Sequence, residues 1–250
     1  MESSSSGRVE LPAAFEEAHI DHLVLLIADM LNRLMTHNDR IPLSPESLTR
    51  FHSRSAPNIS VLDYLKRIVR FTNVEKSCLL ITLHYIDQIC ARTPIFTLSS
   101  LTCHRFIIAA ITVSSKGLCD SFCTNHLYAK VGGISVTELN ILEREFLATI
   151  DWRLMCTREV LQEYYINLVR THSTGQFVIA GADSSPSNSS DSDIDMESGQ
   201  SRPPSPEIPT RPQPGTIPQE VAQRATVEQN MAFAALQQSE DFKGRKGRDG

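Results

Sequence analysis

Apolar residues recur at intervals of three and four through most of the first 170 positions of this 250-residue chain. That spacing is typical of helices with one apolar face turned toward a core. It predicts helices over about 14–36, 59–72, 74–92, 98–118 and 124–131, a long one beginning at Ser135, and another over about 157–171. No strand pattern competes with them, so we expect an all-α fold.

Several local signals set the expected limits of these helices. Pro94 prevents the second of the main helices from continuing. Gly132-Gly133 is a natural helix stop, and S-V-T-E (135–138) predicts a capping box with reciprocal bonds between Ser135 and Glu138. Thr157 is expected to cap the last helix. The stretch F-I-I-A-A-I (106–111) is apolar on all sides, which predicts a helix surrounded by others.

Composition divides the chain into four parts. Residues 1–12 are rich in serine and expected to be disordered, and 13–58 hold the N-terminal helix and a proline-containing linker. Residues 59–172 form the main helical domain. Residues 173–250 are rich in serine, proline and acids, with few large apolar groups to offset chain entropy, so we expect disorder and at most a weak helix at 219–238.

Charge and cysteine content narrow the class of protein. The formal net charge is −5, no run approaches the ~18 apolar residues of a membrane span, and the first residues lack a secretory signal pattern. We therefore expect a protein of the nucleus and cytoplasm, without a membrane partner, whose six cysteines are reduced. Cys119, Cys123 and His126 are conceivable zinc ligands, but no fourth ligand is evident.

The sequence offers little support for catalysis. It contains no G-x-S-x-G, H-E-x-x-H or phosphate-binding G-x-x-x-x-G-K-[ST] motif. His84 and Asp87 share a helix face, but no nucleophile is placed beside them. We expect no enzyme activity, cofactor or metal. Basic residues gather around the first main helix (Arg50, Arg54, Lys66, Arg67, Arg70), and because the chain is acidic overall they suit a protein partner better than nucleic acid.

Several separated stretches resemble one family. S-V-L-D-Y-L-K-R-I-V-R (60–70), H-Y-I-D-Q-I (84–89) and L-T-C-H-R-F-I-I-A-A-I-T-V-S-S-K (101–116) look like the first three helices of a cyclin box. L-T-R-F-H-S-R-S-A-P-N-I-S (48–60), D-S-F-C-T-N-H-L-Y-A-K-V-G-G-I-S (120–135) and E-L-N-I-L-E-R-E-F-L (138–147) resemble the fungal phosphate-system (PHO-type) cyclins. The resemblance implies a single five-helix cyclin box with an extra N-terminal helix and a disordered C-terminal tail.

The resemblance implies a regulatory subunit that binds and activates a cyclin-dependent protein kinase by packing on the helix that carries the kinase's ATP-positioning Glu. By match to the family motif, Lys116 and Asp120 are expected to anchor the kinase. Asp120 opposes the macrodipole of its own helix, so its carboxylate is better suited to a partner. Arg67 and Arg70 lie where the family's first helix meets the kinase. Phe122 is a candidate aromatic anchor or, equally, a core plug.

Further expectations concern the core, the C-terminal tail and the partners. Tyr64, Leu65 and Trp152 are assigned to the core, and Ser185 and Ser205, each followed by proline, are candidate phosphorylation sites. The resemblance also implies phosphorylation of a transcription factor in phosphate-responsive gene control, and an inhibitor of the kinase pair as a further partner. The main alternatives are a helical adaptor or transcription scaffold that keeps the cyclin fold without a kinase, and a nucleic-acid-binding domain.

Overall fold

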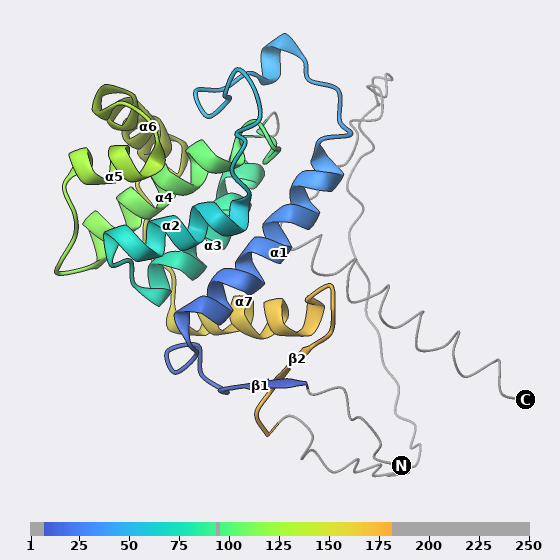
Figure 1. Ribbon diagram of the computed structural model, residues 1–250. Helices are drawn as coiled ribbons and strands as arrows, with labels where there is room; N and C mark the ends of the chain where they lie inside the picture. Colours follow the sequence, from blue (N-terminus) through green and yellow to red (C-terminus); the bar gives the residue numbers. More distant parts are fainter. Residues whose placement is uncertain (1–7, 94–95, 182–250) are drawn as a thin grey trace, which may run out of the picture.

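A helix buried on all sides, α4 (Cys103–Leu118), lies at the centre of the domain (Figure 1). The computed structural model describes residues 8–93 and 96–181, and within them seven α-helices and two short strands form the fold. The other helices are α1 (Ile20–Asn38), α2 (Val61–Thr72), α3 (Lys76–Arg92), α5 (Asn125–Gly132), α6 (Val136–Thr149) and α7 (Arg158–Thr171). The predicted all-α class is confirmed. Among the described helices none is both long and apolar enough for a membrane span.

Helices α2, α3, α5 and α6 all contact α4, while α1 packs on α2 and α3, and α7 packs on α3 and α1. The buried run from Phe106 to Ile111 includes Ala109 and Ala110, whose small side chains let neighbouring helices approach closely. One end of the core is aromatic, because Phe51, Phe96, Phe106, Phe146 and Tyr85 contact one another edge-on or tilted. The predicted central helix is therefore confirmed.

Most predicted helix ends are present, with one difference in a cap. The hydroxyls of Ser135 and Thr157 accept bonds from backbone N–H groups three residues on, and Gly133 ends α5 with a left-handed φ of 71°. The reciprocal half of the capping box was predicted wrongly. The Glu138 carboxylate pairs instead with Arg105 of α4, because that cation offers a stronger interaction than a neutral backbone N–H.

The N-terminal helix begins later than its apolar pattern suggested. Residues 14–19 form turns, and α1 starts at Ile20 after His19, whose ring nitrogen accepts from the Asp21 N–H. Phe15 is buried without being helical, and its N–H donates to the Gln162 side chain of α7 at 3.1 Å. The apolar residues before Ile20 are thus spaced as in a helix because some of them are buried, although the backbone there is not helical.

The two ends of the described chain meet in a small parallel sheet. Strand β1 (Val9–Leu11) pairs with β2 (Phe177–Ile179), with Glu10 opposite Val178. The disorder predicted for 1–12 and 173–250 is therefore wrong at residues 9–11 and 177–179. Their partners lie more than 160 positions apart, so no local pattern could show the pairing. The rest of the expected tail, including 219–238, Ser185 and Ser205, lies outside the described residues.

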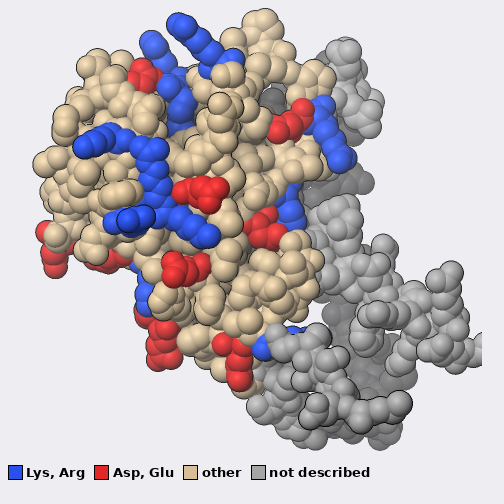
Figure 2. All heavy atoms as spheres, viewed as in Figure 1, with Lys and Arg blue, Asp and Glu red and all other residues tan. Residues whose placement is uncertain are grey.

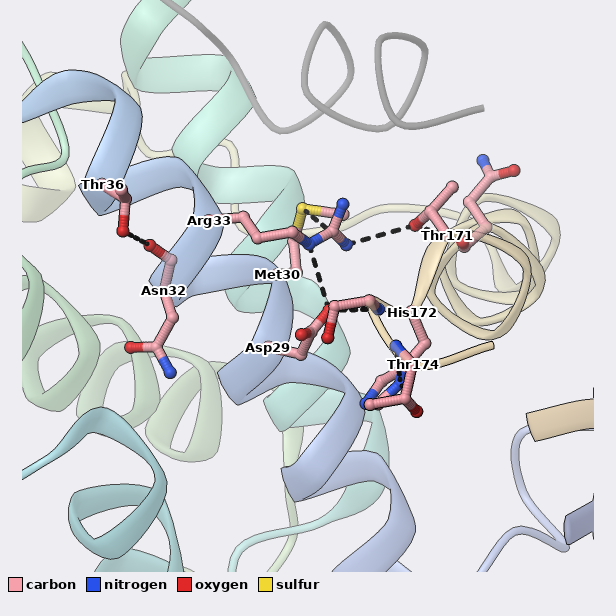
Figure 3. A network of polar contacts seen from close by, with 10 residues as sticks. Asp29, Met30, Asn32, Arg33, Thr36, Thr171, His172 and Thr174 are labelled. Carbon is pink, nitrogen blue, oxygen red and sulfur yellow. Dashed lines mark hydrogen bonds and ion pairs between the residues drawn. The ribbon is translucent and has the colours of Figure 1, made fainter. Parts of the chain in front are cut away.

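A polar network fastens the chain after α7 to α1 (Figure 3). The Asp29 carboxylate accepts from the Arg33 guanidinium at 3.1 Å and from the Ser173 N–H at 3.2 Å, while Arg33 also donates to the Thr171 hydroxyl at 3.4 Å. The buried His172 ring stands perpendicular to Phe177 of β2, with ring centroids 4.9 Å apart. Together these contacts hold the last described segment on the N-terminal helix.

Candidate functional site

Lys116, in the last turn of α4, is bound to two other helices. Its ammonium pairs with the Glu143 carboxylate of α6 and lies 3.3 Å from the Asn125 amide oxygen at the start of α5. The Asn125 amide donates in turn to the second Glu143 oxygen at 2.9 Å. The side chains of Lys116 and Glu143 are 32 % and 15 % exposed, so the pair is half-covered by its own chain. Two of the three ammonium hydrogens are thus directed inward, and a third is available to a partner.

Glu143 was not among the predicted site residues. The sequence places it next to Leu142, on the inner side of α6, where an acid is unusual. An acid on the inner side of a helix could therefore have indicated a buried partner. That partner, Lys116, lies 27 positions earlier, and only the fold brings the two side chains together.

Asp120 lies beyond the end of α4 and is exposed. Because the helix stops at Leu118, Asp120 does not stand one turn above Lys116, and the Lys116 ammonium pairs with Glu143 instead. Among the described residues, the Asp120 carboxylate forms no hydrogen bond or ion pair. Its role in binding a partner stays a prediction.

The loop that carries Asp120 is held by two cysteines. The Cys119 and Cys78 sulfurs are 3.3 Å apart, and the Cys123 thiol donates to the Thr72 carbonyl at the end of α2. The two loop cysteines thus contact different neighbours, and among the described residues no three His, Cys, Asp or Glu side chains are grouped to hold a metal ion. Phe122, between them, is 53 % exposed, which rules out its alternative role as a core plug.

Trp152 was assigned to the core from the sequence, but this prediction is wrong, because Trp152 is 68 % exposed. Asp151 and Trp152 both have left-handed φ values, 57° and 58°, and this turn after α6 points the indole away from the domain. Met155 is 79 % exposed and Leu118 37 %, whereas Leu154, which precedes Met155, lies against Gly117 at the end of α4. Large apolar side chains therefore emerge close to the Lys116 end of α4.

Arg67 and Arg70 are exposed on α2. Arg67 donates to the Lys130 carbonyl in the last turn of α5 at 3.0 Å, and the Arg70 guanidinium lies 5.4 Å from the centre of the Phe71 ring. The bond between Cys123 and Thr72 brings the end of α2 beside the loop that carries Phe122. The structure thus groups Arg70 with Phe122, while Arg67 also stabilises α5.

The remaining polar candidates on α3 are bound within the fold. The Asp87 carboxylate accepts from the Tyr164 hydroxyl of α7 at 2.5 Å, and the His84 ring lies 2.8 Å from the Gln88 amide. Burial lowers the pKa of His84. This cluster joins α3 to α7.

Comparison with known proteins shows which family the domain resembles. Residues 21–154 match the family model for cyclins. The chain is 48 % identical over 158 residues to the Nuc-1 negative regulatory protein preg of Neurospora crassa, which covers 62 % of this chain and 33 % of that protein. It is 44 % identical over 158 residues to the PHO85 cyclin PHO80 of Saccharomyces cerevisiae, covering 62 % of this chain and 54 % of that protein.

A plant relative, Cyclin-U4-1 of Arabidopsis thaliana, is 33 % identical over 146 residues, which cover 57 % of this chain and 72 % of that protein. The chain spans one third to about half the length of the two fungal relatives. The matched region runs from α1 to the turn that carries Trp152 and thus contains the whole helical layer around α4. Because this family model matches more than half of its residues, the chain belongs to the cyclin family.

Proposed function

We propose that this chain binds and activates a cyclin-dependent protein kinase through the surface at the C-terminal end of α4. We call this surface the α4 end face and define it by Lys116, Glu143, Leu118, Trp152 and Met155. The observation that carries the proposal is a half-covered ion pair at the end of α4 together with exposed large apolar side chains on the segment that packs against Gly117, the residue after Lys116. Aromatic and methionine side chains exposed around a rigid polar centre are typical of protein-binding surfaces.

The arrangement suggests how binding could act on a kinase. Activation requires the kinase helix with the ATP-positioning Glu to move into place. Trp152, Met155 and Leu118 offer apolar area against such a helix, and this area is exposed to water in the free chain. Lys116, already oriented by Glu143 and Asn125, can donate to a partner carbonyl with little loss of side-chain entropy.

We also propose that Asp120, Phe122 and Arg70 extend this contact at one side, since the loop after α4 and the end of α2 lie together. We include Arg67 in this contact, although its guanidinium already donates to the Lys130 carbonyl of α5.

The relatives' names guide the biological side of the proposal. One of them is named a negative regulatory protein and another a PHO85 cyclin. We infer that the kinase pair phosphorylates a transcription factor in phosphate-responsive gene control, that an inhibitor protein regulates it, and that it acts in nucleus and cytoplasm.

The test separates contact with a kinase from stability of the fold. PHO85, the protein in the yeast relative's name, is mixed with the full chain, and complex formation and kinase activity are measured. In the double variant Lys116→Glu/Glu143→Lys the internal pair is kept but reversed, so the fold should persist while binding falls at least tenfold. The exposed Arg170 of α7 provides the control, Arg170→Ala, which should bind like wild type.

If the reversed pair binds and activates the kinase normally, the α4 end face is not the contact. If the unaltered chain recovers no kinase activity at all, the adaptor alternative is favoured.

A further inference from the structure

A strip of positive charge runs over α2 and the end of α5. We call it the α2 basic strip and define it by Lys66, Arg67, Arg70 and Lys130, all exposed. Figure 2 shows blue side chains gathered on this face, over α2 and α5. The hydrogen bond from Arg67 to the Lys130 carbonyl fixes the two helices together, so the strip is a continuous feature of the fold.

The charges of this strip are not neutralised within the described part of the chain. None of its four side chains forms a salt bridge to a carboxylate there, whereas Arg33, Arg105 and Lys116 each do. Asp63 is on the same helix, but its carboxylate accepts from the Ser60 hydroxyl at the helix start. An acidic partner would therefore meet an excess of positive charge.

Two aromatic side chains border the strip. Phe71 and Phe122 are each 53 % exposed, and Arg70 lies over the Phe71 ring. The bond from the Cys123 thiol to the Thr72 carbonyl, 3.3 Å long, keeps the two aromatic positions on adjoining segments. The surface thus combines four cations with exposed rings, which suits an acidic peptide that also carries apolar side chains.

The chain itself contains such a peptide outside the described residues. Residues 191–197 read D-S-D-I-D-M-E, with four acids alternating in part with Ile194 and Met196. Asp191 follows Gly181, the last described residue, by ten positions, and this length of chain can span up to ~35 Å when extended. This length is about twice the ~16 Å radius of gyration of a domain of this size, which makes contact with a distant part of the same domain feasible.

We propose that the acidic segment 191–197 binds the α2 basic strip of its own chain, with Ile194 or Met196 against Phe71 and Phe122. Intramolecular attachment raises the effective concentration of the segment, so weak contacts suffice. Phosphorylation of Ser190 or Ser192 would strengthen the contact by adding negative charge opposite arginines. Because we propose above that Arg70 and Phe122 extend the kinase contact, a bound segment would compete with the kinase, and this consequence alone depends on the proposed function.

Zero-length carbodiimide cross-linking of the full chain without any kinase tests the contact. Amide bonds should form between Lys66 or Lys130 and the carboxyl groups of 191–197, identified by mass spectrometry in the monomer band. We expect at least a fivefold loss of these products in 0.5 M salt and in Arg67→Ala/Arg70→Ala, because neither change removes a cross-linked group. The matched control is Arg40→Ala/Arg170→Ala, which also removes two exposed arginines and should leave the products unchanged.

Three results would overturn the inference. The first is the absence of these cross-linked products, and the second is their presence only in the dimer band, which would make a second copy the partner. The third is a yield of products that changes neither in salt nor in Arg67→Ala/Arg70→Ala. The salt series needs no variant, so a folding defect of the double variant cannot hide the answer. Cross-linking in the absence of kinase also keeps failure of this contact separate from failure of the kinase proposal.

Discussion

Gly132 and Gly133 are neighbours at the end of α5, but each is needed for a different reason. A Cβ on Gly132 would lie 2.8 Å from the Ile108 Cγ1 atom in the buried centre of α4. A Cβ on Gly133 would meet nothing within 4 Å, but its φ of +71° is strained for other residues.

We therefore expect Gly132→Ala to lower the free energy of unfolding by about 1–3 kcal/mol through overpacking, and Gly133→Ala by about 1 kcal/mol through backbone strain. Urea denaturation of both variants measures the difference. Gly133→Asn is the control, because asparagine tolerates this conformation and should restore most of the loss. A harmless Gly132→Ala would mean that α5 is not packed closely on α4.

Trp152 offers a second prediction at the scale of one residue. Since the indole is 68 % exposed, Trp152→Ala should change the unfolding free energy by less than about 0.5 kcal/mol. Binding of a kinase should nevertheless fall at least tenfold if the α4 end face is the contact, because exposed tryptophans are frequent energetic centres of interfaces. Calorimetry of unfolding and a binding titration on one preparation separate the effects. A destabilised variant that binds normally would contradict both statements.

At the scale of the helices, caps decide where elements begin. The Ser135 hydroxyl accepts from the Glu138 N–H at 3.1 Å, while the Glu138 carboxylate is held by Arg105. Ser135→Ala should therefore lower the unfolding free energy by about 1 kcal/mol, and Ser135→Gly by only a few tenths. Thermal unfolding of the two variants is the measurement. Equal losses would indicate that the hydroxyl bond contributes little.

The helices could be predicted from the sequence, whereas the contacts between segments far apart in the chain could not. The stripe of α2 and the all-apolar stretch of α4 are local signals, and both helices are present, although α4 begins at Cys103 and not near residue 98 as predicted. The β1–β2 pairing depends on residues more than 160 positions apart, which no local window contains. Trp152 misled because its size suggests burial, whereas two consecutive left-handed residues turn it outward.

The candidate site was predicted in part for the same reason. Lys116 was predicted from its match to the family motif, and Phe122 as a candidate aromatic anchor in the loop after it. Glu143 was missed, since its partnership with Lys116 is a property of how α6 packs on α4.

At the scale of the whole molecule, we expect the buried and half-buried histidines to make stability depend on pH. Burial lowers the pKa of His52, His84, His104 and His172. The His104 Nε2–H lies 3.0 Å from the Ile59 carbonyl, while its Nδ1 is buried without a hydrogen-bond partner in the described structure. A proton on Nδ1 would therefore be an unsatisfied buried donor.

A pKa lowered by folding means that the unfolded chain takes up protons first as pH falls. The unfolding free energy should thus be level above about pH 7 and decline from about pH 6.5 toward pH 5, before carboxylates titrate. Urea denaturation at several pH values measures this slope. His104→Gln should flatten it, and a stability that rises between pH 7 and pH 5 would contradict the assignment of neutral native rings.

The parallel pairing of β1 with β2 has a mechanical consequence. A load that pulls residue 8 and residue 181 apart acts along the strands in opposite directions, since both strands run the same way. The inter-strand bonds, such as those from Val9 N–H to the Gln176 carbonyl and from Ala180 N–H to the Leu11 carbonyl, would then be sheared together instead of opening one after another. Tension between the two ends of the domain would meet this short ladder before it reached the helices.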